Sequence, residues 1–555
     1  MPAIRAIPTY KASRLQAQSQ NHKFDIIPAP VRGLDISRPF VDQDPKTALL
    51  LRNCIARRYG CELRGGWRRH TTNLGGVGTE ASVVTIMGYQ PPRGFGSTQL
   101  AKLFAACDDG EIYDVTTASN EAAVPASVAT LAGQSEPGEV SFDNFATANT
   151  NYLLVVSAGF GYITYDAVGG WVNRNAATIG SVVAATIDSV MVWKNRIWFI
   201  EENSTRAHFL PVGQLTGTTS VFDFGPLLTH GGELRAMASW TLDSGDGIDD
   251  KLVIVGSQGD VLVYGGTDPT SAATFGIVGR WYVGPPPAGR RFMGKYGGDL
   301  SILCEHGVEY MSRMLSAKGL LDPETEGDDS LSHRFSEVIG RDIRSTRGQT
   351  GWSVLHVPSL ESAILVTPHN EYTTGVQYCF STIPAGWSDF KGMPMVSAEV
   401  FNGELYFGTA NGRVGRAFAC DSDDELTDGT VGTTVVGDVQ SAFVAPNDDR
   451  VSLKRPVLIM PMFQGTRSPS LLARVNTEWS DAGVSGSPSY VADSTSTWGS
   501  AIWGTAVWAG ALNTFLAWMG ATGLGCFMSI RLSFTGARGT LFTSWKVIYE
   551  PGGVM

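Results

Sequence analysis

The sequence predicts an all-β protein, most of it a β-propeller, in which small four-stranded sheets called blades form a ring. Hydrophobic residues make up 43% of the 555 residues, whereas charged residues make up only 17%, less than the roughly 25% of an average domain. Glycine is abundant at 65 residues, as in proteins rich in turns. Hairpin-like units also recur every 45 to 55 residues or so, roughly the period of propeller blades.

Each of these units has two apolar runs joined by a short polar turn. In the stretch KLVIVGSQGDVLVYGG (251–266) the turn is at Gln-Gly, and in ELYFGTANGRVGRAF (404–418) it is at Asn-Gly. Asn-Gly is the strongest short hairpin signal, because a two-residue turn needs a positive φ that glycine adopts without steric cost. The turn centres lie near residues 110, 160, 203, 259, 307, 359 and 412.

Seven such hairpins predict six to eight blades, with seven favoured. A two-stranded hairpin is only marginally stable alone in water, so each unit needs a neighbour to pack against. Segments between the hairpins, such as ATIDSVMVWK (185–194), would supply the remaining strands. The alternative is a pair of ordinary β-sandwiches whose turns fall at a regular spacing by coincidence.

The two ends of the chain lack this regular spacing of hairpins. It stops after the acidic stretch Asp421–Asp438, and the β-rich segment beyond predicts an additional platform domain formed by the chain ends. We therefore divide the chain into an N-terminal segment (1–90) that contributes to the platform and leads into the propeller, the propeller (91–430) and the C-terminal platform (431–555). Within the first segment, DPKTALLLRNCIA (44–56) predicts a short helix capped by Asp44, with Pro45 in its first turn.

Charge and cysteine usage limit the cellular setting. The net charge of −11 argues against a surface that grips nucleic acid. The seven cysteines are scattered and odd in number, and the N-terminus has no apolar signal sequence, so we expect folding in a reducing cytoplasm. The stretch Ser494–Ile530 has no charged residue, but many small polar residues interrupt it, and we interpret it as buried strands.

No pattern of residues predicts catalysis. The chain has no phosphate-binding glycine loop, no HExxH and no GxSxG, and its eight histidines are dispersed. We expect no enzyme activity, no catalytic residues, no cofactor and no metal site.

An arginine-rich cluster stands out in this acidic chain. The stretch RRYGCELRGGWRRH (57–70) holds Arg57, Arg58, Arg64, Arg68 and Arg69, with Trp67 interleaved. Arginine beside aromatic rings suits a subunit or partner interface, or DNA phosphates. The alternative is a strand pair whose arginines lie in solvent or pair with acidic neighbours.

Three tryptophans, Trp498, Trp503 and Trp508, recur every five residues in STWGSAIWGTAVWAG. An odd spacing puts alternate side chains on opposite faces of a strand, so one regular strand cannot bury all three together. We predict that they serve a core or a subunit interface, where tryptophan is favoured, and keep a carbohydrate-stacking platform as the alternative.

The N-terminal segment PAPVRGLDISRPFVDQDPKTALLLRNCIARRYGCELRGGWRRHTTNL resembles a segment typical of the tail nozzle, or tail tubular hub, proteins of short-tailed (podovirus-like) bacteriophages. These proteins carry Asp-Pro-x-x-Ala-Leu-x-Leu-x-Asn and then Leu/Val-x-x-Arg-x-Gly. The matching positions here are Asp44, Pro45, Ala48, Leu49, Leu51 and Asn53, then Leu63, Arg64, Gly65 and Gly66. The hairpin KLFAACDDGEIYDVT, the tryptophan run and the closing YEPGGVM are also similar to theirs.

The resemblance implies a structural virion protein of a viral tail. It would form a homo-hexamer below the portal and its adaptor, continue the DNA ejection channel and support tail fibres or tailspikes. Double-stranded DNA would pass transiently, without sequence-specific binding, and assembly would occur in the host bacterial cytoplasm. The alternative function is a propeller enzyme, or a carbohydrate-binding propeller, acting on host surface polysaccharide.

Overall fold

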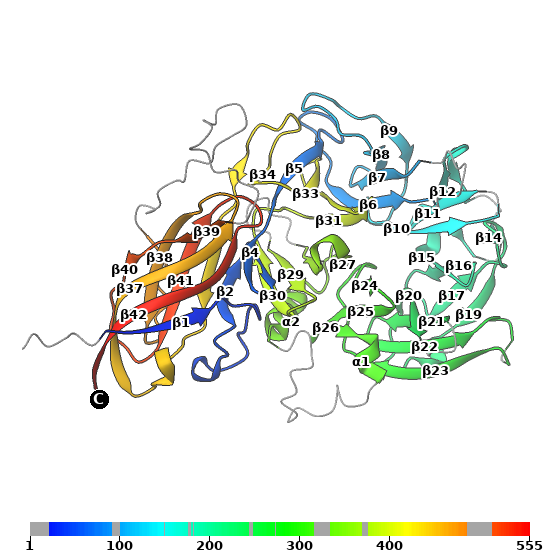
Figure 1. Ribbon diagram of the computed structural model, residues 1–555. Coiled ribbons are helices and arrows are strands. Elements are labelled where there is room, and N and C mark those ends of the chain that lie inside the picture. The colour runs from blue at the N-terminus through cyan, green and yellow to red at the C-terminus, as the bar shows by residue number, and fades with distance from the viewer. Residues whose placement is uncertain are drawn as a thin grey trace, which may run out of the picture.

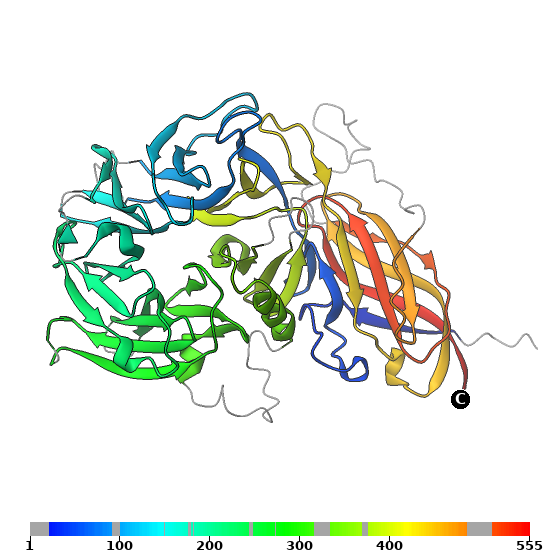
Figure 2. The same cartoon turned by 180° about the vertical axis from the view of Figure 1, so that it is seen from behind.

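A computed structural model shows a ring of small β-sheets with a β-sandwich attached to one side (Figure 1). The structure describes residues 22–91, 100–148, 150–175, 179–180, 182–243, 248–271, 273–315, 334–368, 376–485 and 513–554. The ring is the predicted β-propeller, and the sandwich is the predicted β-rich domain formed by the chain ends. Both views of the ribbon show the sandwich beside the ring rather than across its face (Figures 1 and 2).

Within the described residues, the ring consists of six blades with four strands each and one with three. Blade 1 contains β6 (Val83–Tyr89), β7 (Lys102–Cys107), β8 (Glu111–Asp114) and β9 (Ser127–Thr130). Blade 2 contains β10 (Ser141–Ala146), β11 (Asn151–Ser157), β12 (Gly161–Asp166) and β13 (Gly170–Asn173). Blade 3 contains β15 (Ile187–Trp193), β16 (Arg196–Glu201), β17 (Arg206–Phe209) and β19 (Ser220–Asp223). Blade 4 contains β20 (Leu234–Asp243), β21 (Ile248–Gly256), β22 (Asp260–Gly266) and β23 (Phe275–Tyr282).

The remaining blades complete the circle. Blade 5 is the three-stranded one, with β24 (Met293–Tyr296), β25 (Asp299–Cys304) and β26 (Gly307–Tyr310), and it contacts helices α1 (Met311–Leu315) and α2 (Ser336–Ser345). Blade 6 contains β27 (Ser353–Val357), β28 (Ser362–Val366), β29 (Gln377–Ser381) and β30 (Gly386–Phe390). Blade 7 contains β31 (Ser397–Phe401), β32 (Glu404–Gly408), β33 (Val414–Cys420) and β5 (Gly66–Thr71). Strand β31 packs on β6 of blade 1, which closes the ring.

The last blade is closed by a strand from the opposite end of the chain. Strand β5 precedes blade 1 in the sequence, yet it pairs antiparallel with β33 as the outer strand of blade 7. Two propeller strands, β5 and β6, thus lie before residue 91, where the sequence division places the start of the propeller. Two short pairs supplement the blades: β14 (Ile179–Gly180) with β18 (Gly217–Thr218), and β34 (Ser422–Asp423) with β35 (Thr433–Thr434).

The sandwich consists of two sheets drawn from both chain ends. The first sheet has the strand order β3-β4-β42-β37-β39, and in addition β1 pairs with β42 and β40 pairs with β37. Its strands are β1 (Lys23–Pro28), β3 (Cys54–Arg57), β4 (Gly60–Leu63), β37 (Ser452–Gly465), β39 (Asn513–Leu516), β40 (Met519–Gly520) and β42 (Leu541–Val554). The second contains β2 (Ala48–Arg52), β36 (Gly437–Ser441), β41 (Met528–Thr535) and β38 (Ser470–Thr477). It continues into blade 6, because Arg52 of β2 pairs in parallel with Asp389 of β30.

One hydrophobic core joins the sandwich to the ring. Trp545 and Val547 of β42 belong to the same buried cluster as Trp387 of blade 6, Ile302 of blade 5 and Val253 of blade 4. Burying such large side chains against each other is the main stabilising term in folding. The sandwich is therefore packed onto the propeller and does not hang from a linker.

The seven hairpins expected from the sequence are all present, which confirms the fold class. At the turn of KLVIVGSQGDVLVYGG, Gly259 has φ +95°, and a side-chain carbon there would lie 2.3 Å from the backbone of Gly284. The Asn-Gly turn of blade 7 places Gly412 at φ +63°. Glycine is thus required at these turns for the backbone conformation and, at Gly259, also for space.

The prediction of a short helix at 44–56 is wrong. The stretch forms strands β2 and β3, which are separated by Asn53 at φ +54°. Asp44 does cap a turn, since its Oδ1 accepts a hydrogen bond from the amide of Lys46 at 2.8 Å, but no helix follows. Pairing of β2 with β36 and of β3 with β4 outweighs the local helix signals.

The uncharged stretch Ser494–Ile530, for which we expected buried strands, contains strands but is not buried throughout. Its described residues include strands β39 and β40 and the start of β41, but Leu516, Trp518 and Leu524 are at least half exposed. The expectation of buried strands is therefore wrong for this part of the stretch.

We predict that Gly259→Ala destabilises the propeller more than Gly403→Ala. Gly403 also has positive φ, +82°, but a side-chain carbon there would meet open space. Backbone strain alone costs about 1 to 3 kcal/mol, and only Gly259→Ala adds a clash with backbone. Thermal unfolding followed by circular dichroism should show the larger fall in unfolding temperature for Gly259→Ala. Equal falls for the two variants would contradict the steric part of this account.

Candidate functional site

The arginine-rich stretch 57–70 is the sequence-predicted site that the structure describes most fully. It begins in the sandwich with the β3–β4 hairpin and ends in β5 of blade 7, so it crosses the junction between the two parts of the molecule. Most of its arginines pair with acidic residues of the same chain. This arrangement matches the alternative in which the arginines pair with acidic neighbours.

Arg64 is the most deeply placed of these arginines, at 1% exposure. Its guanidinium forms a two-pronged pair with Asp423 of β34, with Nη1–Oδ1 at 2.7 Å and Nη2–Oδ2 at 2.6 Å. Its Nε donates to Oδ1 of Asn53 at 3.0 Å, and its remaining N–H groups donate to the carbonyls of Gly65 and Lys391. Every side of the buried cation is thus met by an oxygen, as such a charge requires.

Asn53 explains part of this geometry. Its left-handed backbone conformation separates β2 from β3, and its side-chain oxygen also accepts from the amide of Lys391 at 2.8 Å. Burial raises the pKa of Asp423, and the hydrogen bonds from Arg64 counteract that rise. The neighbouring Trp67 is equally buried and donates from Nε1 to the carbonyl of Gly392 at 2.8 Å.

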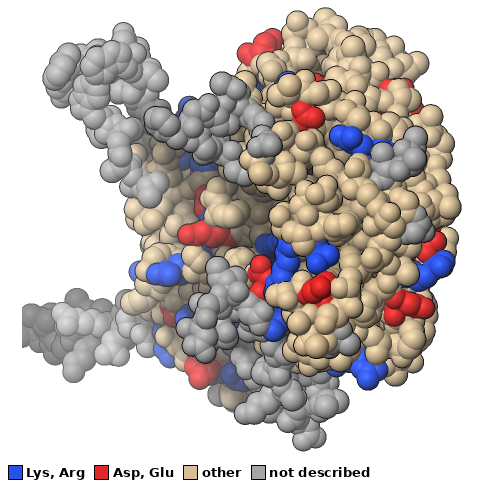
Figure 3. All heavy atoms as spheres, turned by 90° about the vertical axis from the view of Figure 1, so that its right-hand side faces the viewer, with Lys and Arg blue, Asp and Glu red and all other residues tan. Residues whose placement is uncertain are grey.

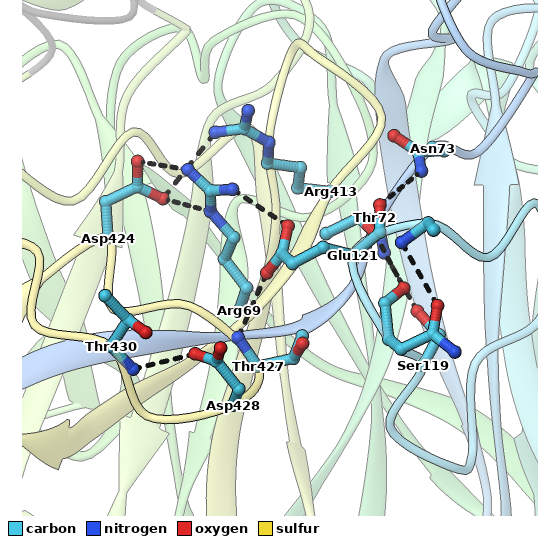
Figure 4. Close-up of polar contacts among 12 residues, drawn as sticks. Arg69, Thr72, Asn73, Ser119, Glu121, Arg413, Asp424, Thr427, Asp428 and Thr430 are labelled. Atoms are coloured by element: carbon cyan, nitrogen blue, oxygen red, sulfur yellow. Dashed lines mark hydrogen bonds and ion pairs between the residues drawn. The ribbon is translucent and has the colours of Figure 1, made fainter.

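Arg69 is the centre of a second network, at the outer edge of blade 7 (Figure 4). Its Nε and Nη2 donate to the two carboxylate oxygens of Asp424, both at 2.7 Å, and its Nη1 donates to Glu121 at 2.9 Å. Glu121 also accepts from the amide of Thr427 at 3.0 Å. Arg413 lies 3.6 Å from the same Asp424. The pairing with Asp424 raises the pKa of Arg69, so the cation is held charged.

The nine candidate interface residues therefore divide into four groups. Arg64 and Trp67 are buried within the chain. Arg57, Arg68 and Arg69 pair with Glu62, Glu425 and Asp424, respectively, and Arg58 lies exposed at the tip of the β3–β4 hairpin. Trp498, Trp503 and Trp508 lie outside the described residues. Nothing in the structure tests the interface hypothesis, which stays a prediction for these nine residues.

A second arginine pair, which sequence reasoning missed, occupies the axis of the propeller. Arg290 pairs with Asp188 of blade 3 and donates from Nη1 to the carbonyl of Arg235 in blade 4 at 3.1 Å. The only sequence signal for this pair is two adjacent arginines after the run GPPPAG, which precedes blade 5.

Arg291 reaches the other side of the ring. It donates to the carbonyl of Val84 in blade 1 at 3.1 Å and to Glu139 beside blade 2 at 2.7 Å. Its own carbonyl accepts from the amide of Val354 in blade 6 at 3.1 Å. The two adjacent arginines thus connect blades on all sides of the axis and occupy the space between them.

The inner strand of blade 7 adds a carboxyl group to this axis. Glu399 of β31 lies against β6, where a side-chain carbon added at Gly88 would be 3.6 Å from its Oε1. Burial raises the pKa of Glu399 to about 8, although Arg291 works in the opposite direction. At neutral pH this carboxyl group therefore keeps its proton in the folded protein.

The described part of the chain offers little that is typical of an enzyme. No group of three or more His, Cys, Asp or Glu side chains is arranged there to hold a metal ion. A polar hollow is lined in part by residues of blade 4, and the two arginines in its wall, Arg235 and Arg347, pair with Glu233 and Glu305, both at 3.3 Å. None of the helices in the described residues has the length and apolar character needed to cross a membrane.

Comparisons with known proteins bear on the fold alone. No family model and no curated protein matches the chain. Among solved structures, the β-propeller domain of Cps50 (Swd1) from Myceliophteria thermophila is 13% identical, covering 57% of this chain and 93% of its own, with a TM-score of 0.36.

Two further structures are similar in part. The extracellular domain of a hybrid two-component system from B. thetaiotaomicron is 12% identical, with a TM-score of 0.37, over 68% of this chain and 49% of its own. BBS1N, solved in complex with ARL6DN, is also 12% identical, with a TM-score of 0.25, over 40% of this chain and 60% of its own. This chain thus spans about half to three fifths of these two structures, and likenesses this distant carry no argument about function.

We predict that Arg64→Met strongly destabilises the protein. The substitution leaves Asp423 buried without its counter-charge, and breaking a buried pair in this way costs about 3 to 5 kcal/mol. The matched control is Arg416→Met, whose partner Glu404 and own side chain are both more than two fifths exposed, so that its loss should cost at most about 1 kcal/mol. Urea unfolding of the two variants measures the difference. Similar midpoints would contradict a structural role for the Arg64 pair.

We also predict that Glu399→Gln removes a pH-dependent loss of stability. In the unfolded chain this glutamate loses its proton near pH 4.5, whereas in the folded protein it keeps it up to about pH 8. The folded state therefore binds more protons across this window, and raising the pH through it destabilises the wild type. The unfolding temperature of Glu399→Gln relative to wild type should rise from pH 5 to pH 8. The exposed control Glu337→Gln should show no such trend, and a flat difference for Glu399→Gln would refute the assignment.

Proposed function

We propose that this protein is a structural subunit of the tail nozzle of a short-tailed bacteriophage. In this role several copies form a ring that continues the DNA ejection channel below the portal and its adaptor. The observation that carries the proposal is a propeller joined to a β-sandwich built from both chain ends, with the nozzle-like N-terminal segment lying across that junction. Asn53, Leu63 and Arg64, all positions of the resemblance, meet at this place.

The propeller axis supports a channel built between copies rather than within one. Arg290 and Arg291 cross the axis and bind carboxylates and carbonyls on opposite sides of it. A DNA duplex therefore has no route through a single ring of blades. A channel would need several chains around a common axis, and the proposed number is six.

The charge of the protein suits a channel that DNA must pass without adhering. The net charge is −11, and on the outer side of the propeller acidic and basic side chains are interspersed among many uncharged ones (Figure 3). A DNA-binding surface would instead concentrate lysine and arginine on one face. The proposed partners are a portal–adaptor protein above the ring and tail fibres or tailspikes at its outside, in a virion assembled in the bacterial cytoplasm.

Negative-stain electron microscopy tests this function directly. The purified protein is imaged alone and after mixing with a portal–adaptor complex from the same source. We expect six-fold rings with a central pore in at least one of the two samples. Isolated single propellers in both would contradict the proposal, and binding and hydrolysis assays on host surface polysaccharide would then test the alternative function.

A further inference from the structure

The outer face of the seven-stranded sheet is apolar although it is exposed. Along β42, Trp545, Val547 and Tyr549 point into the sandwich core, so the alternate residues Lys546 and Ile548 point outward. Phe24 and Ile26 of β1 are 58% and 54% exposed on this side. A sheet face of a monomeric protein usually turns polar residues to water, so this pattern indicates a surface that another molecule covers.

The strand register makes these side chains one continuous surface. Residues directly opposite each other in an antiparallel pair share a face. Phe24 lies opposite Ile548, and Ile548 lies opposite Leu458 of β37. In the next row Ile26, Lys546 and Met460 follow one another. In the row after that, Met462 lies between Ser544 of β42 and Leu516 of β39. We call the surface formed by Phe24, Ile26, Leu458, Met460, Met462, Leu516, Trp518, Lys546 and Ile548 the outer sheet face.

Lys546 is the one charged residue among these nine. Its ammonium lies over the ring of Phe24 at 4.4 Å and 5.9 Å from the centre of the ring of Trp518. No acidic side chain of the described residues is within ion-pair distance of it. A cation held between two aromatic rings in an apolar surface is well placed to receive a carboxylate from a partner that also brings apolar side chains.

A surface with the complementary properties lies elsewhere on the same chain. The loop before β2 contains the 3-10 turn η1 (Phe40–Asp42), where Phe40 and Val41 are each 48% exposed and Asp42 is exposed beside them. Phe40 packs on Phe443 and Trp479 at the end of the second sheet, which holds the turn out as a fixed projection. In Figure 1 this loop is the dark blue segment beneath β2.

We propose that the outer sheet face binds the η1 turn of a second copy of this chain, with Lys546 of one copy pairing with Asp42 of the next. The apolar side chains of Phe40 and Val41 would then cover Phe24, Leu458 and their neighbours. A second pairing of opposite charges is available between Arg38, on the same loop, and Glu550 at the rim of the face, where Glu550 lies 3.7 Å from Arg455.

The charges select a head-to-tail contact. Two outer sheet faces packed against each other about a two-fold axis would bring Lys546 of both copies together, and like charges in an interface oppose association. Contact between two different surfaces of the same chain instead generates a ring or a filament. A patch of four strands is roughly 300 Å² from strand spacing and rise, so it would form the apolar centre of an interface of about 800 Å² per partner.

This inference rests on the proposed function in that it names the contact by which the ring closes. The charge-reversed variants Lys546→Glu and Asp42→Lys test it, because both residues are on the surface and each variant should fold. Each variant alone should raise the concentration for half-assembly at least about tenfold, as for loss of a close charge pair at an interface. The control Arg280→Glu, an exposed site on β23, should assemble like wild type.

Restoring the opposite charges separates a direct contact from a general effect. In a chain that carries both Lys546→Glu and Asp42→Lys, the introduced carboxylate faces the introduced ammonium of the neighbouring copy, so rings should form again. An equimolar mixture of the two single variants should also form rings, with the two chains alternating, which only an even number of subunits permits. Mass photometry and electron microscopy measure ring formation by the double variant and by the mixture.

The outcomes distinguish this contact from the function itself. Wild-type rings that are unaffected by either single variant, or not restored by the double variant or the mixture, would overturn the contact and leave the nozzle function standing; another part of the chain or another virion protein would then cover the face. Wild-type protein that stays monomeric, alone and with the portal–adaptor complex, would overturn both.

Discussion

The antiparallel pairing of β5 with β33 holds the two ends of the chain together, because a strand that precedes blade 1 completes blade 7 and fixes the sandwich beside the ring. The strand enters from the sandwich, where the chain turns at Arg64, and the buried pair of Arg64 with Asp423 holds this turn. Arg69 then fastens the outer edge of the same strand to Asp424 and Glu121. A strand from one chain end thus completes a blade made by the other, so neither end can leave without opening the ring.

The axis provides the second constraint. Seven sheets around a centre leave space that side chains must fill, and Arg290 and Arg291 fill it with charges that bind several blades at once. Buried charges are costly unless they are paired, so the carboxylates of Asp188 and Glu139 are as necessary to this centre as the arginines. Glu399 adds a carboxyl group whose raised pKa reflects the same scarcity of water. Arg290 and Arg291 thus bind blades on opposite sides of the axis to one another.

The sandwich carries the surface that we propose for contact between copies. Its inner faces share a core with blades 4, 5 and 6, while the outer sheet face presents apolar side chains around Lys546. In the proposed ring, this surface would set the angle between one copy and the next, and that angle decides whether a ring can close. The proposed nozzle and the proposed contact thus use different parts of the same architecture.

Local sequence patterns were enough to specify the class of fold. Apolar runs broken by Asp-Gly, Gln-Gly and Asn-Gly turns specify hairpins locally, because only glycine adopts the backbone conformation of such turns at no cost, as Gly259 and Gly412 show. Tertiary structure decided what depends on partners distant in the chain. The stretch 44–56 has helical signals, yet it forms strands because β36 and β4 offer hydrogen bonds, and Arg64 meets an aspartate 359 residues away. The same holds for the axial arginines and for the exposed face around Lys546, since neither the axis nor a sheet face exists until strands from both ends of the chain have assembled.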